Sequence, residues 1–181
     1  STGFSIEQNY FTKNTSAPTG IYIGTYIANT KAVDVVYENT YENLSFANRA
    51  EGQCHIDEGT REGLAYYCND NAENYQDFRI DKFEGYGAIQ AVIGTDTNAA
   101  GNSFTQFPDY NIYNNGNHAI IYYYDDLEPI VNRDMVGPIK GSVNDCQDHY
   151  GGITTDVVLS EAQKLQIKAK YASDSTTYKT R

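Results

Sequence analysis

The chain has 181 residues, which is enough for one domain with a hydrophobic core of ordinary size. Its 24 acidic and 13 basic residues give a net charge of −11, which disfavours nucleic acid or an anionic membrane as a partner. No apolar run approaches the length of a membrane-spanning helix, so we expect no membrane insertion.

Short apolar segments separated by turns run through most of the chain. The segments are rich in Tyr, Ile, Val, Phe and Thr, and Gly, Asn and Asp fill the turns between them. Many short strands at regular spacing, with no apparent internal repeat, predict a mainly β single domain that forms a barrel or a sandwich. The predicted strands are residues 20–28, 32–37, 53–56, 64–68, 77–83, 88–93, 103–107, 119–124 and 128–132.

The three cysteines predict one disulfide. Cys54 and Cys68 flank a turn-like sequence, EGTREG, and a hairpin there would place the two cysteines opposite each other. We therefore expect the bridge Cys54–Cys68, although either residue could instead reach Cys146. The remaining thiol would be free or intermolecular.

Several features favour an extracellular location. A disulfide forms and persists in oxidising compartments. Two N-glycosylation sequons begin at Asn14 and Asn43, which would be usable in a secretory pathway. The acidic net charge also suits a protein of extracellular fluid. We expect a secreted glycoprotein.

One segment near the C-terminus has helical rather than alternating periodicity. Residues 159–172 carry Leu and Ala at helical spacing between good helix formers. Ser160 followed three residues later by Gln163 forms a capping box. The pattern predicts one amphipathic α-helix that packs its apolar face against the outside of the β structure.

This arrangement resembles a lipocalin, and three local motifs occur in the order of that family. The segment TGIYIGTYIAN resembles the first motif, Gly-x-Trp, with Tyr22 or Tyr26 in place of the tryptophan. The segment FPDYNIYNNGNHAIIYYY resembles the second motif, Thr-Asp-Tyr followed by a strand, with Pro108 in place of the threonine. The segment PIVNRD resembles the third motif, whose arginine would be Arg133.

The resemblance implies an antiparallel up-and-down β-barrel over about residues 20–134, a long loop over about 135–158 and the helix packed outside. In such a barrel Arg133 would stack on the aromatic ring of Tyr26 at the closed end. The loop is longer than is usual for the family. If residues 153–159 form the last strand instead, Arg133 is an ordinary surface arginine.

A lipocalin barrel encloses a ligand cavity, and strand 119–124 would line it with alternate residues. We expect the inward set to be Ile120, Tyr122 and Tyr124, because two hydroxyl-bearing rings could then orient a ligand. Ile89 and Ala91 on the segment 88–93 would complete the lining. The expected function is a secreted, non-enzymatic carrier or sequestering protein for a small hydrophobic or amphipathic molecule such as a pigment, lipid or biogenic amine.

Two other functions are compatible with the same pattern. One is an adhesin or pilus-type β-domain without an internal cavity, and the other is a lectin-like sandwich whose exposed tyrosines stack on sugars. The sequence lacks the nucleophile, phosphate-binding and zinc-protease motifs of common enzymes. The three histidines are scattered and no C-x-x-C occurs, so no metal or cofactor is expected. A monomer and a homodimer are both possible.

Overall fold

The computed structural model describes residues 3–14, 16, 19–57, 62–105, 110–125, 135–142 and 146. Within these residues the chain winds into a β-solenoid of about four turns, and each of its sheets pairs parallel strands. No helix occurs among the residues so described. The predicted helix 159–172 and the predicted strand 128–132 lie outside them.

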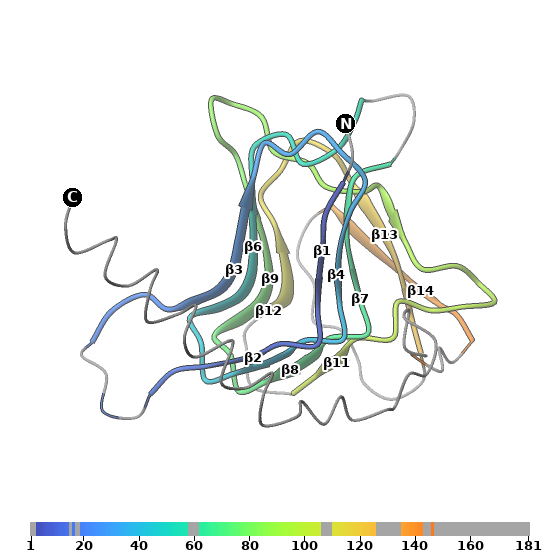
Figure 1. Ribbon diagram of the computed structural model, residues 1–181. Coiled ribbons are helices and arrows are strands. Elements are labelled where there is room, and N and C mark those ends of the chain that lie inside the picture. Colours follow the sequence, from blue (N-terminus) through green and yellow to red (C-terminus); the bar gives the residue numbers. More distant parts are fainter. Residues whose placement is uncertain are drawn as a thin grey trace, which may run out of the picture. The chain divides into compact units, whose positions relative to one another are not determined.

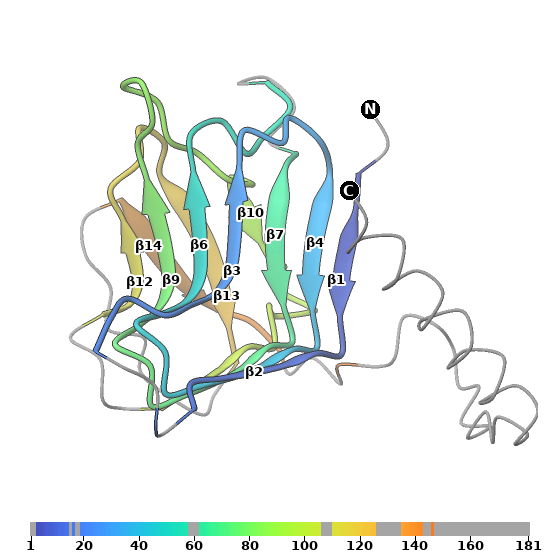
Figure 2. The ribbon, with the colours of Figure 1, turned by 60° about the vertical axis from the view of Figure 1, so that its left-hand side comes forward.

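Each of the first turns passes through three sheets, which form the walls of the solenoid (Figure 1). Sheet I contains β1 (Ser5–Glu7), β4 (Asp34–Tyr37) and β7 (Leu64–Tyr67). Sheet II contains β2 (Tyr10–Thr12), β5 (Thr40–Glu42), β8 (Asp70–Ala72) and β11 (Ser103–Phe104). Sheet III contains β3 (Ile23–Ala28), β6 (Phe46–Glu51), β9 (Gln76–Asp81) and β12 (Tyr110–Asn114). Figure 2 shows the strands of sheets I and III side by side in this order.

A fourth sheet contains β10 (Val92–Ile93), β13 (Ile120–Tyr124) and β14 (Val136–Lys140). Because β10 contacts β7, this sheet IV extends sheet I into the later turns. The interior between the sheets is filled by apolar side chains. Phe78 stacks on Tyr66 with their ring centroids 4.8 Å apart, and Phe104 meets the edge of the Phe78 ring at 5.3 Å.

The lipocalin prediction is therefore wrong. In an up-and-down barrel, hairpins join neighbouring strands, whereas here parallel neighbours are joined by a whole solenoid turn. Alternation of apolar and polar residues is the same in both arrangements, so the strand pattern alone did not separate them. Tyr26 lies on β3 as expected, but it is 53% exposed, and Arg133 lies outside the described residues.

The sequence does contain an internal repeat, so the expectation of no repeat was wrong. Tyr10 pairs with Thr40, and Thr40 with Asp70, so equivalent positions lie 30 residues apart. The segments YENTYENLSFANR and YCNDNAENYQDFR occupy the same place in successive turns. Strands β5, β6 and β8 were missed because their Asn, Asp, Glu and Arg residues are unusual in strands.

A ladder of asparagines occupies the tight turn between sheets I and II. It consists of Asn9, Asn39, Asn69 and Asn102, one from each turn. The backbone N–H of Asn39 donates to the side-chain oxygen of Asn69 at 3.1 Å, and the Asn69 N–H donates in the same way to Asn102 at 2.8 Å. The Asn69 side-chain amide also donates to Val36 O at 3.0 Å. These bonds satisfy buried backbone groups where the sheets are interrupted.

The residue before each asparagine adopts the left-handed conformation that such a turn requires. The φ angles are 56° at Gln8, 51° at Glu38, 56° at Cys68 and 70° at Gly101. Only the last of the four is glycine, so three side chains are held in a conformation that L residues rarely adopt. The asparagine hydrogen bonds help to offset that cost in the three turns without glycine.

The disulfide joins Cys68 to Cys146, and Cys54 is a buried free thiol. The prediction of one bridge and one remaining thiol is confirmed, but the Cys54–Cys68 pairing is wrong. The expected hairpin does occur locally, because His55 pairs antiparallel with Gly63. Cys68 instead lies in the tight turn that follows β7, next to the asparagine ladder.

We expect replacement of Asn69 by Ala to lower the free energy of unfolding by roughly 2–4 kcal/mol, because it removes an acceptor from Asn39 and a donor from Val36. Urea denaturation measures the effect. The matched control is Asn98→Ala in an exposed turn, which should change stability by no more than about 0.5 kcal/mol. Equal stability of the two variants would contradict a structural role for the ladder.

Burial also raises the pKa of the Cys54 thiol, so Cys54 should not react with a thiol reagent in the folded protein. Under denaturing, non-reducing conditions we expect one reactive thiol per chain. Peptide mapping should place the disulfide between the peptides that contain Cys68 and Cys146. Three reactive thiols in the unreduced chain would show that the bridge does not form.

Candidate functional site

The outer face of sheet III carries two arginines between two tyrosines, all in register. Tyr26 on β3 pairs with Arg49 on β6, Arg49 with Arg79 on β9, and Arg79 with Tyr113 on β12. Neighbouring strands lie about 4.8 Å apart, so the four side chains extend over about 14 Å across the strands. We call this set the Tyr-Arg row.

Each guanidinium in the row stacks on an aromatic ring. The Arg49 Cζ lies 5.5 Å from the centroid of the Tyr26 ring, and the Arg79 Cζ lies 5.1 Å from that of Tyr113. Arg79 also lies over Phe46, at 4.9 Å. Cation–π contacts of this kind hold the planar guanidinium groups in fixed orientations.

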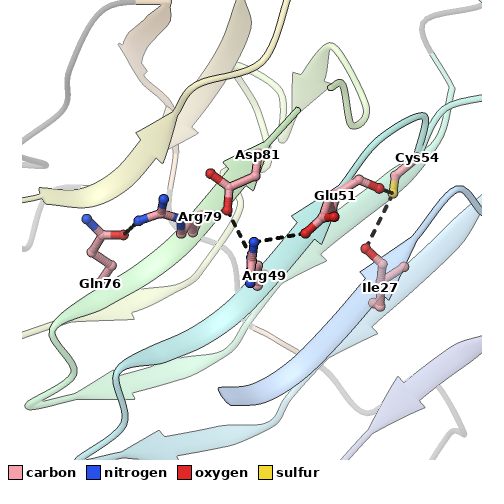
Figure 3. Close-up of polar contacts among 7 residues, drawn as sticks. All are labelled: Ile27, Arg49, Glu51, Cys54, Gln76, Arg79 and Asp81. Carbon is pink, nitrogen blue, oxygen red and sulfur yellow. Dashed lines mark hydrogen bonds and ion pairs between the residues drawn. The ribbon is translucent and has the colours of Figure 1, made fainter. Parts of the chain in front are cut away.

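Carboxylates beside the row fix the arginines further (Figure 3). Arg49 forms ion pairs with Glu51 at 2.8 Å and with Asp81 at 2.9 Å. Arg79 pairs with Asp81 at 2.7 Å and donates to the Gln76 side-chain oxygen at 3.1 Å. The arginine side chains remain 29% and 27% exposed. Two positive and two negative charges thus form one ordered network with no net charge.

This face can bind a ligand that offers both apolar faces and hydroxyl groups. The exposed ring of Tyr26 provides a stacking surface. The arginine N–H groups donate hydrogen bonds, and the Glu51 and Asp81 carboxylates accept them. Because the network already fixes these groups, binding requires little further loss of side-chain entropy.

A pocket of about 520 Å³ lies where the chain leaves the strands of sheet III. Parallel strands end at the same edge of a sheet, so the loops after β3, β6 and β9 meet there. The pocket is open to solvent on one side, and Phe83 in its wall is 46% exposed. It is lined by Asn29, Lys31, Gln53, Phe83, Glu84 and Tyr86.

The residues expected to line a barrel cavity lie elsewhere. Ile120 and Tyr122 are buried in the packed core and line no barrel cavity, and Tyr124 packs partly against the same core. Ile89 is also buried and Ala91 is half-buried. The Tyr122 hydroxyl accepts a hydrogen bond from the side-chain amide of Asn102 at 2.9 Å, at the end of the asparagine ladder. These residues are part of the packed interior and do not meet the Tyr-Arg row.

Tyr26 was expected to be a structural residue, whereas no role was predicted for Arg49, Arg79 or Tyr113. The repeat was the signal that could have found them. The sequences FANR and QDFR align at the 30-residue period, and this alignment places Arg49 beside Arg79. Without the 30-residue period, the sequence does not indicate that Arg49 and Arg79 lie side by side.

Comparisons with protein-family models, curated proteins and solved structures give no match for this chain. Among the described residues, no helix is long and apolar enough to cross a membrane. In the same part of the chain, no three His, Cys, Asp or Glu side chains form a group that could hold a metal ion.

A buried carboxyl group, Asp77, lies in β9 between Gln76 and Arg79 of the network. Asp77 is fully buried and accepts hydrogen bonds from the side-chain amides of Asn74 at 3.1 Å and Asn111 at 2.8 Å. Burial raises its pKa to about 7, although the two hydrogen bonds oppose that shift. The folded state therefore holds a proton on Asp77 more tightly than the unfolded state does.

This difference predicts the direction of a pH effect on stability. Protonated Asp77 adds to the free energy of unfolding. This stabilisation is fully present below the ordinary pKa of 3.8 and is lost as the pH rises to about 7, the pKa in the folded state. We expect Asp77→Asn to remove this pH dependence. The stability of the variant, compared with that of the wild type at the same pH, should therefore be higher at pH 8 than at pH 4. Urea denaturation of both proteins across this range measures the difference, and parallel curves would contradict the assignment.

Proposed function

We propose that the protein is an extracellular, non-enzymatic glycan-binding module, and that a neutral saccharide chain binds along the Tyr-Arg row. The observation that carries this proposal is the in-register arrangement of Tyr26, Arg49, Arg79 and Tyr113 on one face. The function corresponds to the lectin-like alternative of the sequence analysis, placed on a solenoid instead of a sandwich.

The chemistry of a saccharide fits this face. One side of a sugar ring presents C–H groups that can stack on an exposed tyrosine, and its hydroxyls can bond to arginines and carboxylates. Stacked solenoid turns repeat the same contacts across neighbouring strands, which suits a ligand made of repeated units. A polymer can thus gain affinity from several weak contacts at once.

The charges favour a neutral glycan over an acidic one. Arg49 and Arg79 are already paired with Glu51 and Asp81, so neither guanidinium offers an uncompensated positive charge. The chain as a whole carries a net charge of −11, which repels polyanions. Both facts also argue against a phosphate-rich ligand.

The disulfide between Cys68 and Cys146 supports an extracellular location, because such bonds persist in oxidising compartments. A carrier with an internal ligand depended on the lipocalin barrel, and we do not propose it. A surface site of the kind described here needs no internal cavity.

We expect Tyr26→Ala to weaken binding of neutral polysaccharides roughly 10-fold or more, since base–aromatic and comparable ring stacking contribute about 1–3 kcal/mol. The side chain is exposed, so the fold should be unaffected. A glycan array selects the ligand, and calorimetry then measures affinity. Tyr10→Ala is the matched control, because Tyr10 is a tyrosine of similar exposure on sheet II.

Arg79→Lys provides a second variant that keeps the charge but loses the planar fork and its stacking. It should also weaken binding, whereas the control should bind like the wild type. Equal affinity of the Tyr26→Ala variant and the wild type, or absence of any bound glycan on the array, would contradict the proposal.

A further inference from the structure

Two histidines and a tyrosine from different turns meet in the loops beyond sheet III. His55 follows β6, Tyr86 follows β9 and His118 follows β12. Their rings form a triangle: the centroid distances are 5.6 Å from His55 to Tyr86, 5.6 Å from Tyr86 to His118 and 5.7 Å between the two histidines. The solenoid thus brings together histidines that are scattered in the sequence.

The polar atoms of these rings converge. The Tyr86 hydroxyl is hydrogen-bonded to His55 Nε2 and lies 3.2 Å from His118 Nε2. His55 Nδ1 lies 2.9 Å from the backbone oxygen of Asp57. A carbonyl can only accept, so Nδ1 of His55 carries a proton and, in the neutral ring, Nε2 presents its lone pair to Tyr86.

This is the arrangement that metal-binding histidines usually have. A histidine that binds a metal through one ring nitrogen commonly donates the other N–H to a backbone carbonyl or a carboxylate, which fixes the orientation of the ring. Zinc–nitrogen bonds of about 2.0–2.1 Å place the ligand atoms of a tetrahedral site about 3.3 Å apart. The separation of 3.2 Å between Tyr86 Oη and His118 Nε2 is close to that value. His55 Nε2 and Tyr86 Oη are closer because they share a proton, and they must move apart when a metal ion replaces that proton.

The cluster also adjoins space for a further ligand. Tyr86 lines the pocket of about 520 Å³ described above, and Tyr86 and His118 are half-buried while His55 is buried. A metal ion at this site would therefore be accessible to solvent, and a water molecule could occupy one of its coordination positions. The acidic net charge of the chain attracts cations to its surroundings.

We propose that His55, Tyr86 and His118 form a binding site for a divalent transition-metal ion of the Zn²⁺ and Cu²⁺ class. The two Nε2 atoms and the Tyr86 phenolate oxygen are the ligands, and the phenol releases its proton to solvent when the metal binds. Imidazole nitrogens select such ions over Mg²⁺ and Ca²⁺, which prefer oxygen ligands. The site uses none of the residues of the Tyr-Arg row, so it stands independently of the glycan proposal.

Calorimetry on the full chain without a histidine tag tests the site, with Zn²⁺ titrated in an excess of Mg²⁺ that occupies surface carboxylates. We expect one Zn²⁺ per chain. His118→Gln and His55→Gln should each weaken binding roughly 100-fold, more than loss of an outer hydrogen bond does. His118 is half-buried, so its variant keeps the test decisive if replacement of buried His55 disturbs folding, which circular dichroism would reveal.

Titration with Cu²⁺ gives a second readout that only the tyrosine ligand can produce. Coordination of a phenolate to Cu²⁺ yields a charge-transfer absorption in the visible range, and Tyr86→Phe should lose this band while retaining weaker binding through the two imidazoles. His149→Gln is the control, because the third histidine of the sequence is not among the described residues of the cluster. Absence of Zn²⁺ binding to the wild type, a visible band that persists in Tyr86→Phe, or an equal loss of affinity in His149→Gln would overturn the proposal.

Discussion

The hydrogen bonds of the asparagine ladder are the interaction on which the rest of the solenoid depends. At the turn from sheet I to sheet II the backbone bends sharply, and its N–H groups cannot continue the pairing of either sheet. The side-chain oxygens of Asn39, Asn69 and Asn102 accept from the backbone of the preceding turn and thereby satisfy these buried donors. A buried N–H group without a partner destabilises the fold by more than one hydrogen bond stabilises it. The ladder therefore fixes the position of each turn relative to the next.

Fixing the turns in this way also organises the outer surface. Once successive turns are in register, residues at equivalent positions lie next to each other whatever their separation in sequence. Arg49 and Arg79 meet on sheet III for this reason, and Asp81 can pair with both. The same constraint brings His55, Tyr86 and His118 together in the loops. Both candidate sites are therefore consequences of stacking.

Part of this structure was accessible from the sequence. The β-rich character and the positions of β3, β4, β7, β9 and β13 follow from alternation and composition. The lipocalin motifs matched short, degenerate patterns that strands of many folds can satisfy. The recurring asparagines were visible in the sequence but were interpreted as ordinary turns, because asparagine is common in turns as well as in such a ladder.

By itself, the sequence determined that the chain is rich in strands and that one disulfide forms among three cysteines. These properties depend on neighbouring residues and on residue counts. Only the tertiary structure decided that the strands pair in parallel and that Cys68 joins Cys146. Strand alternation has a period of two residues and is identical in parallel and antiparallel sheets. The partner of each strand is instead set by hydrogen bonds between turns about 30 residues apart, which no local pattern encodes.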